Sequence, residues 1–140
     1  MKRFMLDTNT ISHLAKANPA VIRRVVAAPI TSLCMSSITA GELLFGLAKR
    51  PEAHRLHVAV RAILRRVDVL PWHETTAENY GTVRADLERD GKILGPLDLL
   101  IATHALSIGA TLVTNDRAFG YVNDLHVEDW TAQSGKFKSA

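Results

Sequence analysis

The feature that most constrains this chain is a regular alternation of short apolar runs with helical patterns. The apolar runs are typical of buried strands, the last being weaker than the others. They are RFML (3–6), SLCMS (32–36), VDVL (67–70), TLVT (111–114) and LHVED (125–129). Strands that alternate with helices form a parallel sheet covered on both faces. The sequence therefore predicts an α/β fold with a central parallel sheet of about four to five strands.

Helical patterns fill the intervals between these runs. Pro19 stands near the first turn of one pattern, and Gly91 and Gly109 follow the ends of two others. The helices are expected from Thr8 onward and over residues 19–28, 39–50, 52–66, 75–90 and 96–108. In open parallel sheets, functional sites form beyond the carboxyl ends of the strands. Polar side chains that follow a strand are therefore the first candidates for a site.

The chain has 140 residues, of which 47% are hydrophobic, so it can form one substantial core. We expect a single domain over residues 1–130 and a polar, flexible tail over residues 131–140. The apolar runs are too short to span a membrane, and Asp7 and Asn9 interrupt any signal peptide, so a cytoplasmic location is expected. The single Cys34 cannot form an internal disulfide and is interpreted as a small buried residue.

Two acidic residues directly follow predicted strands. Asp7 comes after the first strand in MLDTN, and Asp116 comes after the fourth in LVTND. Each could cap the helix that follows, with its side-chain oxygen accepting from unpaired backbone N–H groups. Each also stands at the edge of the sheet where catalytic carboxylates are found. Either position alone leaves both capping and catalysis open.

Two further acidic residues stand on apolar helix faces. Glu42 shares a stripe with Ile38 and Phe45, and Asp98 has Ile101 as an apolar neighbour at helical spacing. An acid on an apolar face is costly unless it is paired or lines a cleft. Glu42 could instead hold its carboxylate in water at the edge of the stripe, and Asp98 could complement the dipole of its helix. One shared pocket would explain all four acids at once.

Such a pocket has a definite chemistry. Neighbouring carboxylates repel one another, which raises their pKa values unless cations are present. Sites dominated by carboxylate oxygens suit Mg²⁺ or Mn²⁺. Within these motifs no histidine or cysteine stands at ligand spacing, which argues against zinc. The formal net charge of +3 permits an anionic partner such as a nucleic acid but does not establish one.

Taken in series, the four motifs resemble those of PIN-domain ribonucleases, and more closely those of VapC toxins from bacterial type II toxin–antitoxin pairs. The matching segments are MLDTN, SSITAGELLFG, GPLDLLIATHAL and LVTNDRAF. The resemblance covers nearly the whole chain and implies a PIN-like, three-layer α/β/α fold. It also implies an endoribonuclease that hydrolyses RNA phosphodiester bonds with Mg²⁺, for which Mn²⁺ can substitute.

The resemblance also assigns roles to individual residues. The implied metal-binding and catalytic acids are Asp7, Glu42, Asp98 and Asp116. Residues expected to support them are Thr8 and Asn9 beside Asp7, and Thr114 and Asn115 beside Asp116. Basic residues that flank the motifs are candidates for RNA contacts, although each could equally belong to a solvated helix surface. They are Lys49, Arg50, Arg84, Arg89, Lys92 and Arg117.

Substrate and partners are also implied by the resemblance. RADLERDGKILGPLD and the late VEDW are similar to the branch of VapC toxins that cuts initiator tRNA in the anticodon loop. The family further implies a VapB-type antitoxin, which places a basic side chain in the acidic pocket. It also implies a homodimer, and promoter DNA that is bound only through the antitoxin complex.

Two other functions are compatible with parts of this pattern. A phosphatase with an aspartyl nucleophile also uses an acid at a strand end together with Mg²⁺. Such enzymes typically carry a second Asp two residues later, where this chain has Asn9. The other alternative is a non-catalytic binding or regulatory module with a PIN-like fold, in which the acids are structural.

Overall fold

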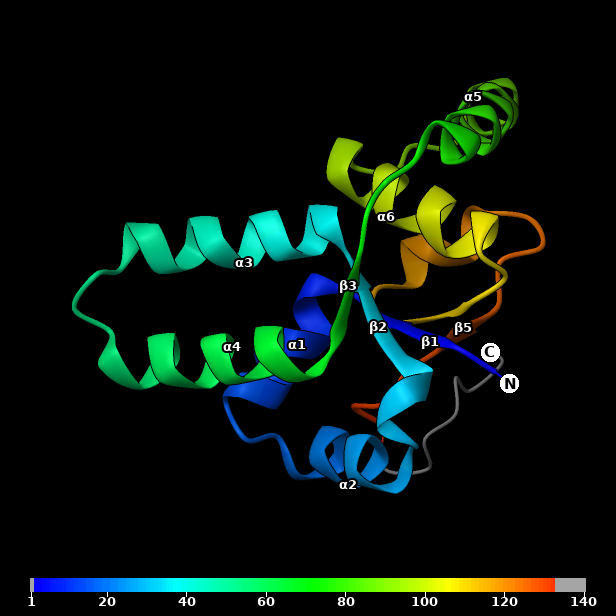
Figure 1. Cartoon of the computed structure of the whole chain (residues 1–140). Coiled ribbons are helices and arrows are strands. Elements are labelled where there is room, and N and C mark those ends of the chain that lie inside the picture. Colours follow the sequence, from blue (N-terminus) through cyan, green and yellow to red (C-terminus); the bar gives the residue numbers. More distant parts are fainter. Residues whose placement is uncertain (1, 133–140) are drawn as a thin grey trace.

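The structure is a computed structural model that describes residues 2–132, and its centre is a five-stranded parallel sheet (Figure 1). The strands lie in the order β3-β2-β1-β4-β5, and every neighbouring pair is parallel. The strands are β1 (Phe4–Leu6), β2 (Leu33–Ser36), β3 (Asp68–Leu70), β4 (Thr111–Val113) and β5 (Val127–Glu128). The predicted α/β fold with a central parallel sheet is confirmed.

Helices connect these strands on both faces of the sheet. They are α1 (Thr8–Ala15), α2 (Pro19–Ala27), α3 (Ser37–Lys49), α4 (His54–Arg66), α5 (Glu74–Arg89) and α6 (Pro96–Ser107), with 3₁₀ helices η1 (Ile30–Ser32) and η2 (Arg117–Tyr121). Helix α3 begins at Ser37, earlier than the predicted residue 39, because Ser36 caps it. The Ser36 hydroxyl oxygen accepts a hydrogen bond of 3.1 Å from the amide of Ile38.

The strands supply two separate cores, one on each face of the sheet. Met5 and Leu112 pack with α5 and α6, whereas Leu6 and Val113 face the core built with α1 to α4. Because both faces are covered, the strands appear in the sequence as continuous apolar runs. Cys34 lies in the first core, and burial raises the pKa of its thiol to about 11. Its interpretation as a small buried residue is confirmed.

Helices α3 and α4 form an arm that extends away from the sheet, while α5 lies on the other side against α6 (Figure 1). Leu43 and Leu47 of α3 are buried in the core beside α4. Leu44 and Phe45 of the same helix are 39% and 62% exposed. The core therefore uses only part of the apolar surface of α3.

Trp130 closes the second core near the end of the described chain. Its indole Nε1 donates to Glu128 Oε1 over 3.0 Å, and the guanidinium of Arg24 stacks on its ring at 5.0 Å. The expected tail lies mostly outside the described residues, which end at Ala132. In residues 2–132 no helix combines the length and the apolar character needed to cross a membrane.

The order of the strands decides where a site can form. From β1 the chain first builds β2 and β3 on one side, and later β4 and β5 on the other. β1 and β4 are therefore neighbours, with Leu6 paired to Val113 at their carboxyl ends. In sheets of this kind, ligands bind at the point where the strand order reverses direction. Asp7 and Thr114 directly follow these two strand ends.

Candidate active site

Asp7 is fixed by hydrogen bonds at the end of β1. Its side chain caps α1, with Oδ1 accepting from the Thr10 amide over 2.8 Å. Its own amide donates to the carbonyl of Val113 over 3.1 Å, and the Thr10 hydroxyl donates to the same carbonyl over 2.8 Å. The residue is only 3% exposed. Burial raises the pKa of Asp7, and the charge of Asp116 raises it further. Hydrogen bonds from Thr114 and Thr10 act in the opposite direction but do not cancel the rise.

Glu42 reaches this edge of the sheet from α3. It is half-buried, and its Oε1 accepts a hydrogen bond of 2.5 Å from the hydroxyl of Thr8. Thr8, predicted to support Asp7, therefore holds the second acid instead. Asn9, the other predicted support, is exposed. Asp7 instead receives hydrogen bonds from Thr10 and Thr114. Thr10 was missed in the sequence, although a capping aspartate predicts a donor three residues later.

Asp98 lies in the first turn of α6, directly after Pro96 and Leu97. It is half-buried, and its pKa is raised to about 6, chiefly by burial and then by the charges of Asp116, Glu42 and Asp7. All three other predicted acids therefore act on this one carboxylate. The pKa of Asp98 thus moves in the direction that repulsion between neighbouring carboxylates predicts.

Asp116 completes the group after β4. Its Oδ1 accepts from the Ala118 amide over 2.9 Å and caps η2, and its own amide donates to the Thr114 hydroxyl over 3.0 Å. Thr114 is fully buried and thus fixes the backbone that carries this acid. Asn115 is exposed and lies 3.4 Å from the imidazole of His13. Of the two explanations left open for Asp7 and Asp116, the structure confirms capping at both positions, and catalysis stays a prediction.

A second set of contacts joins the helices that carry Asp98 and Glu42. The buried His104 of α6 places its Nδ1 2.8 Å from the Ser36 hydroxyl, which caps α3. Burial lowers the pKa of His104, which keeps the imidazole neutral near pH 7. The sequence interpretation did not single out either residue, since neither an interior histidine nor a serine indicates a partner 68 positions away.

The donor chemistry of the acidic group fits a hard divalent cation. All four side chains offer carboxylate oxygens, the ligands that Mg²⁺ and Mn²⁺ prefer. Within residues 2–132, no three acidic, histidine or cysteine side chains are close enough to enclose a metal ion as they stand. The acids thus share one electrostatic environment without forming a closed coordination shell.

The predicted RNA-binding residues do not form one patch. Helix α3 carries Lys49 at its far end, distant from α5 (Figure 1). On α5, Arg84 contacts Tyr80 and Glu88, whereas Arg89 pairs with Asp86 over 2.8 Å. Lys49 and Lys92 lie over aromatic rings, and Arg50 and Arg117 are exposed. Their role in RNA binding stays a prediction.

The raised pKa of Asp98 predicts how stability depends on pH when no divalent metal is present. Between about pH 4 and pH 6 the folded protein binds more protons than the unfolded chain, so this contribution to stability is lost as the pH rises. After allowance for solvent screening, we expect a loss of about 1–2 kcal/mol. Urea unfolding in EDTA across this range, compared between the wild type and Asp98→Asn, measures it. Identical pH dependence in the two proteins would contradict the assignment.

Comparison with known proteins places the chain in a family. The PIN domain model matches residues 4–125. The chain is 38% identical, over 94% of its length and 100% of the relative's, to a tRNA(fMet)-specific endonuclease VapC of Shigella flexneri. The structure matches DNA-bound VapBC of Salmonella typhimurium with a TM-score of 0.86 and 37% identity, covering 93% and 99% of the two chains. It matches VapBC2 of Rickettsia felis, bound to a promoter DNA fragment, with a TM-score of 0.84 and 30% identity, covering 91% and 98%. This chain belongs to the PIN-domain family and, within it, to the VapC ribonucleases.

Proposed function

We propose that this chain is the toxin of a type II toxin–antitoxin pair and hydrolyses RNA phosphodiester bonds with Mg²⁺ or Mn²⁺. The observation that carries the proposal is the environment of Asp98, on which Asp7, Glu42 and Asp116 all act from separate segments of the chain. Four carboxylates at the carboxyl edge of the sheet repel one another, and a bound divalent cation would stabilise them.

The acids would hold the metal, and the other residues would keep them in place. A bound divalent cation supplies Lewis acidity and offsets charge on the phosphate. Thr10 and Thr114 hold Asp7 and the backbone of Asp116, while Thr8 orients Glu42. Because these hydroxyl and amide donors come from well-packed elements, the protein fixes much of the site before RNA arrives.

Initiator tRNA is the proposed substrate. The curated relative from Shigella flexneri is named for tRNA(fMet), and it matches over nearly the whole of this chain. Recognition of such an RNA would rest on its shape and on unstacked bases in a loop. This specificity goes beyond the family assignment and needs its own assay, with initiator tRNA and an elongator tRNA compared side by side.

The proposed protein partner is a VapB-type antitoxin. The relatives from Salmonella typhimurium and Rickettsia felis were solved as VapBC complexes with DNA. A hollow between α1, α3 and α4 is lined by Glu42, Leu43, Leu47 and Leu56, and also by the basic Lys16, Lys49 and Arg50. An antitoxin segment with an apolar face would suit the leucines, and a basic side chain placed beside Glu42 would compete with metal at the acids. Promoter DNA would be bound only through that complex.

A homodimer is proposed on the family resemblance, and the exposed Leu44 and Phe45 are compatible with it. A phosphatase with an aspartyl nucleophile does not agree with membership of the VapC ribonucleases. A binding module without catalysis would bind RNA but never cut it, so the cleavage assay separates it from the proposal.

Removing the metal should abolish cleavage and lower stability together. With EDTA we expect at least about a 100-fold loss of initiator tRNA cleavage, reversed by Mg²⁺ or Mn²⁺, because the phosphate would otherwise face unscreened carboxylates. Saturating Mg²⁺ should also raise the unfolding midpoint by about 5 °C, since a ligand that binds only the folded state stabilises it. Gel-based cleavage and calorimetry measure the two effects. Full activity in EDTA would refute the metal requirement.

A further inference from the structure

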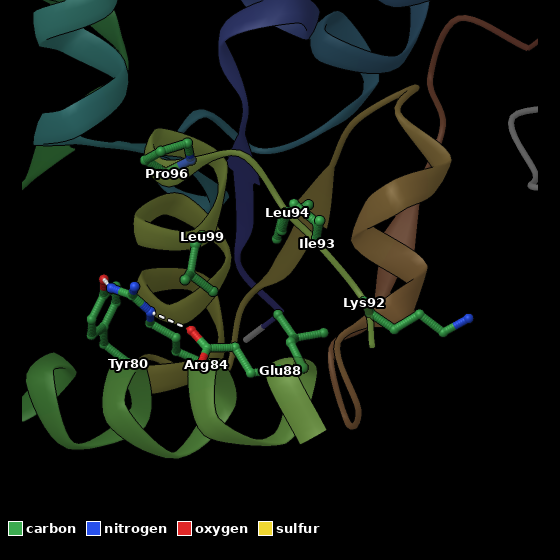
Figure 2. Close-up of a pocket in the computed structure, with 9 residues that line it drawn as sticks. Tyr80, Arg84, Glu88, Lys92, Ile93, Leu94, Pro96 and Leu99 are labelled. Atoms are coloured by element: carbon green, nitrogen blue, oxygen red, sulfur yellow. Dashed lines mark hydrogen bonds and ion pairs between the residues drawn. The ribbon is translucent and has the colours of Figure 1, made fainter. Parts of the chain in front are cut away.

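A hollow of about 220 Å³ lies between α5 and the segment that leads into α6 (Figure 2). Its floor is apolar, formed by the buried Leu87 and Leu99 and the half-buried Leu94. The remaining lining residues are Tyr80, Arg84, Glu88, Lys92, Ile93 and Pro96. An apolar floor with a few polar groups around it is typical of small-ligand sites.

The Arg84 guanidinium is held at two points although it is exposed. Its Nε donates to Glu88 Oε2 over 3.0 Å, and its Nη1 donates to the Tyr80 hydroxyl over 2.9 Å, as Figure 2 shows. The Tyr80 ring in turn meets the edge of Trp72, with 6.2 Å between ring centroids. A planar cation and an aromatic ring are thus positioned at the opening before any ligand binds.

The hollow and the acidic group share the first turn of α6. Pro96 and Leu99 line the hollow, and Asp98 lies between them in the first turn of α6. The same turn therefore presents an acid to the candidate active site and apolar atoms to the hollow. A nucleotide next to the bond cut at the acids would lie within reach of it.

We propose that this hollow receives one unstacked nucleobase of the RNA, next to the bond that is cleaved; the proposal rests on the ribonuclease function proposed above. The leucine floor would cover one face of the base, and the Arg84 plane and Tyr80 would contact it at the opening. Lys92 borders the hollow, but its side chain points away from Tyr80 and Arg84 (Figure 2) and its Nζ lies 4.9 Å from the centre of the Tyr121 ring. The competing occupant is a protein segment, but a hollow of about 220 Å³ has room for a single base, and the planar Arg84 guanidinium held beside Tyr80 favours a flat, polar group.

Binding should be measured in an Asp7→Asn background, so that the RNA stays intact. The probe is a hairpin with the anticodon stem and loop of initiator tRNA, titrated in Mg²⁺. Tyr80→Leu and Arg84→Ala should each raise Kd by about tenfold, the effect typical of losing one base contact. Arg65→Ala removes the same charge from an exposed site on α4 and should change Kd by less than about twofold. Tyr80→Phe keeps the ring and should recover most of the affinity, which guards against a folding defect.

Abasic nucleotides identify the base directly. With each loop position made abasic in turn, one position should weaken binding to the background protein by about tenfold. For the Tyr80→Leu variant, making the same position abasic should raise Kd by no more than about a further twofold. The reason is that the variant has already lost the contact that the missing base would make. In the active protein, Arg84→Ala should raise KM and leave kcat within about twofold.

Three results would overturn the proposal. One is that no abasic position couples to Tyr80, or that Arg84→Ala binds as tightly as Arg65→Ala. A second is that the α5 variants lose self-association or antitoxin binding while their RNA affinity is unchanged, which would make the hollow a protein interface. In both cases the wild type would still cut RNA, so the proposed ribonuclease function would stand although the base-binding proposal fails. The third is a wild type that neither binds nor cuts RNA in Mg²⁺, which removes the function and this subsite together.

Discussion

Replacing Asp98 by Asn should abolish RNA cleavage and, in the same protein, raise stability at neutral pH. Cleavage should fall by about 1,000-fold, equivalent to about 4 kcal/mol, because one of the anionic groups around the metal is lost. In EDTA the unfolding midpoint should rise, because Asp98 is the carboxylate whose pKa is raised to about 6 by burial and by three neighbouring acids. Active sites commonly carry such a conflict between function and stability.

The size of the stability gain follows from two opposing effects. Relief of repulsion and desolvation at pH 7 should contribute about 1–2 kcal/mol after solvent screening is allowed for. Loss of a negative charge from the first turn of α6 should cost about 0.3–1 kcal/mol. The net gain is about 1 kcal/mol, or about 3 °C in the midpoint. Asp90→Asn, the same change at an exposed site, is the control. A variant that keeps full activity, or that is less stable than the wild type at pH 7 in EDTA, would contradict this assignment.

Two variants of Asp7 can separate the structural role of its carboxylate from its chemical role. Asn caps helices about as well as Asp, so Asp7→Asn should keep the hydrogen bond from the Thr10 amide while losing the charge. Asp7→Ala loses both and should be less stable by about 1–2 kcal/mol. Both variants should lose cleavage by about 1,000-fold. Urea unfolding and single-turnover cleavage, measured on the same preparations, test the two roles independently.

The decisive comparison is between the two Asp7 variants. If Asp7 were only a helix cap, Asp7→Asn would cut RNA nearly as fast as the wild type and Asp7→Ala would be the weaker enzyme. If the residue serves the metal, the two variants should be equally inactive despite their different stabilities. Thr10→Ala loses the hydroxyl bond to the Val113 carbonyl but keeps both the amide donor and the Asp7 charge, so it should retain activity at a temperature where it is folded.

Much of the fold could be predicted from the sequence because its determinants are local. Buried strands such as β1 and β4 need apolar side chains on both faces, so they appear as uninterrupted runs. Gly109, with a φ of 68°, follows α6 as expected of a residue that ends a helix in the left-handed region. The start of α3 was placed late because the preference for Ser36 as its cap was overlooked.

The candidate site was only partly predictable. Asp7 and Asp116 stand after strands, and topology alone brings such positions to one edge of a sheet. Glu42 and Asp98 were conspicuous because acids are rare on apolar helix faces. Their hydrogen-bond partners were a different matter. Thr8 was assigned to the wrong acid, and the contact between His104 and Ser36 was not foreseen, because side-chain pairing across 34 and 68 positions leaves no pattern in the sequence.

The sequence by itself predicted the alternation of strands and helices, a parallel sheet covered on both faces, and four acids as candidates for one site, whereas the single core it led us to expect is divided in two by the sheet. These depend on apolar periodicity and on residue chemistry, which each segment carries alone. Only the tertiary structure decided that Asp98 experiences all three other acids, that Thr8 binds Glu42, and that a hollow forms between α5 and the segment that leads into α6. The reason is physical: electrostatic repulsion, burial and hydrogen bonding depend on distances in space, and chain folding sets those distances.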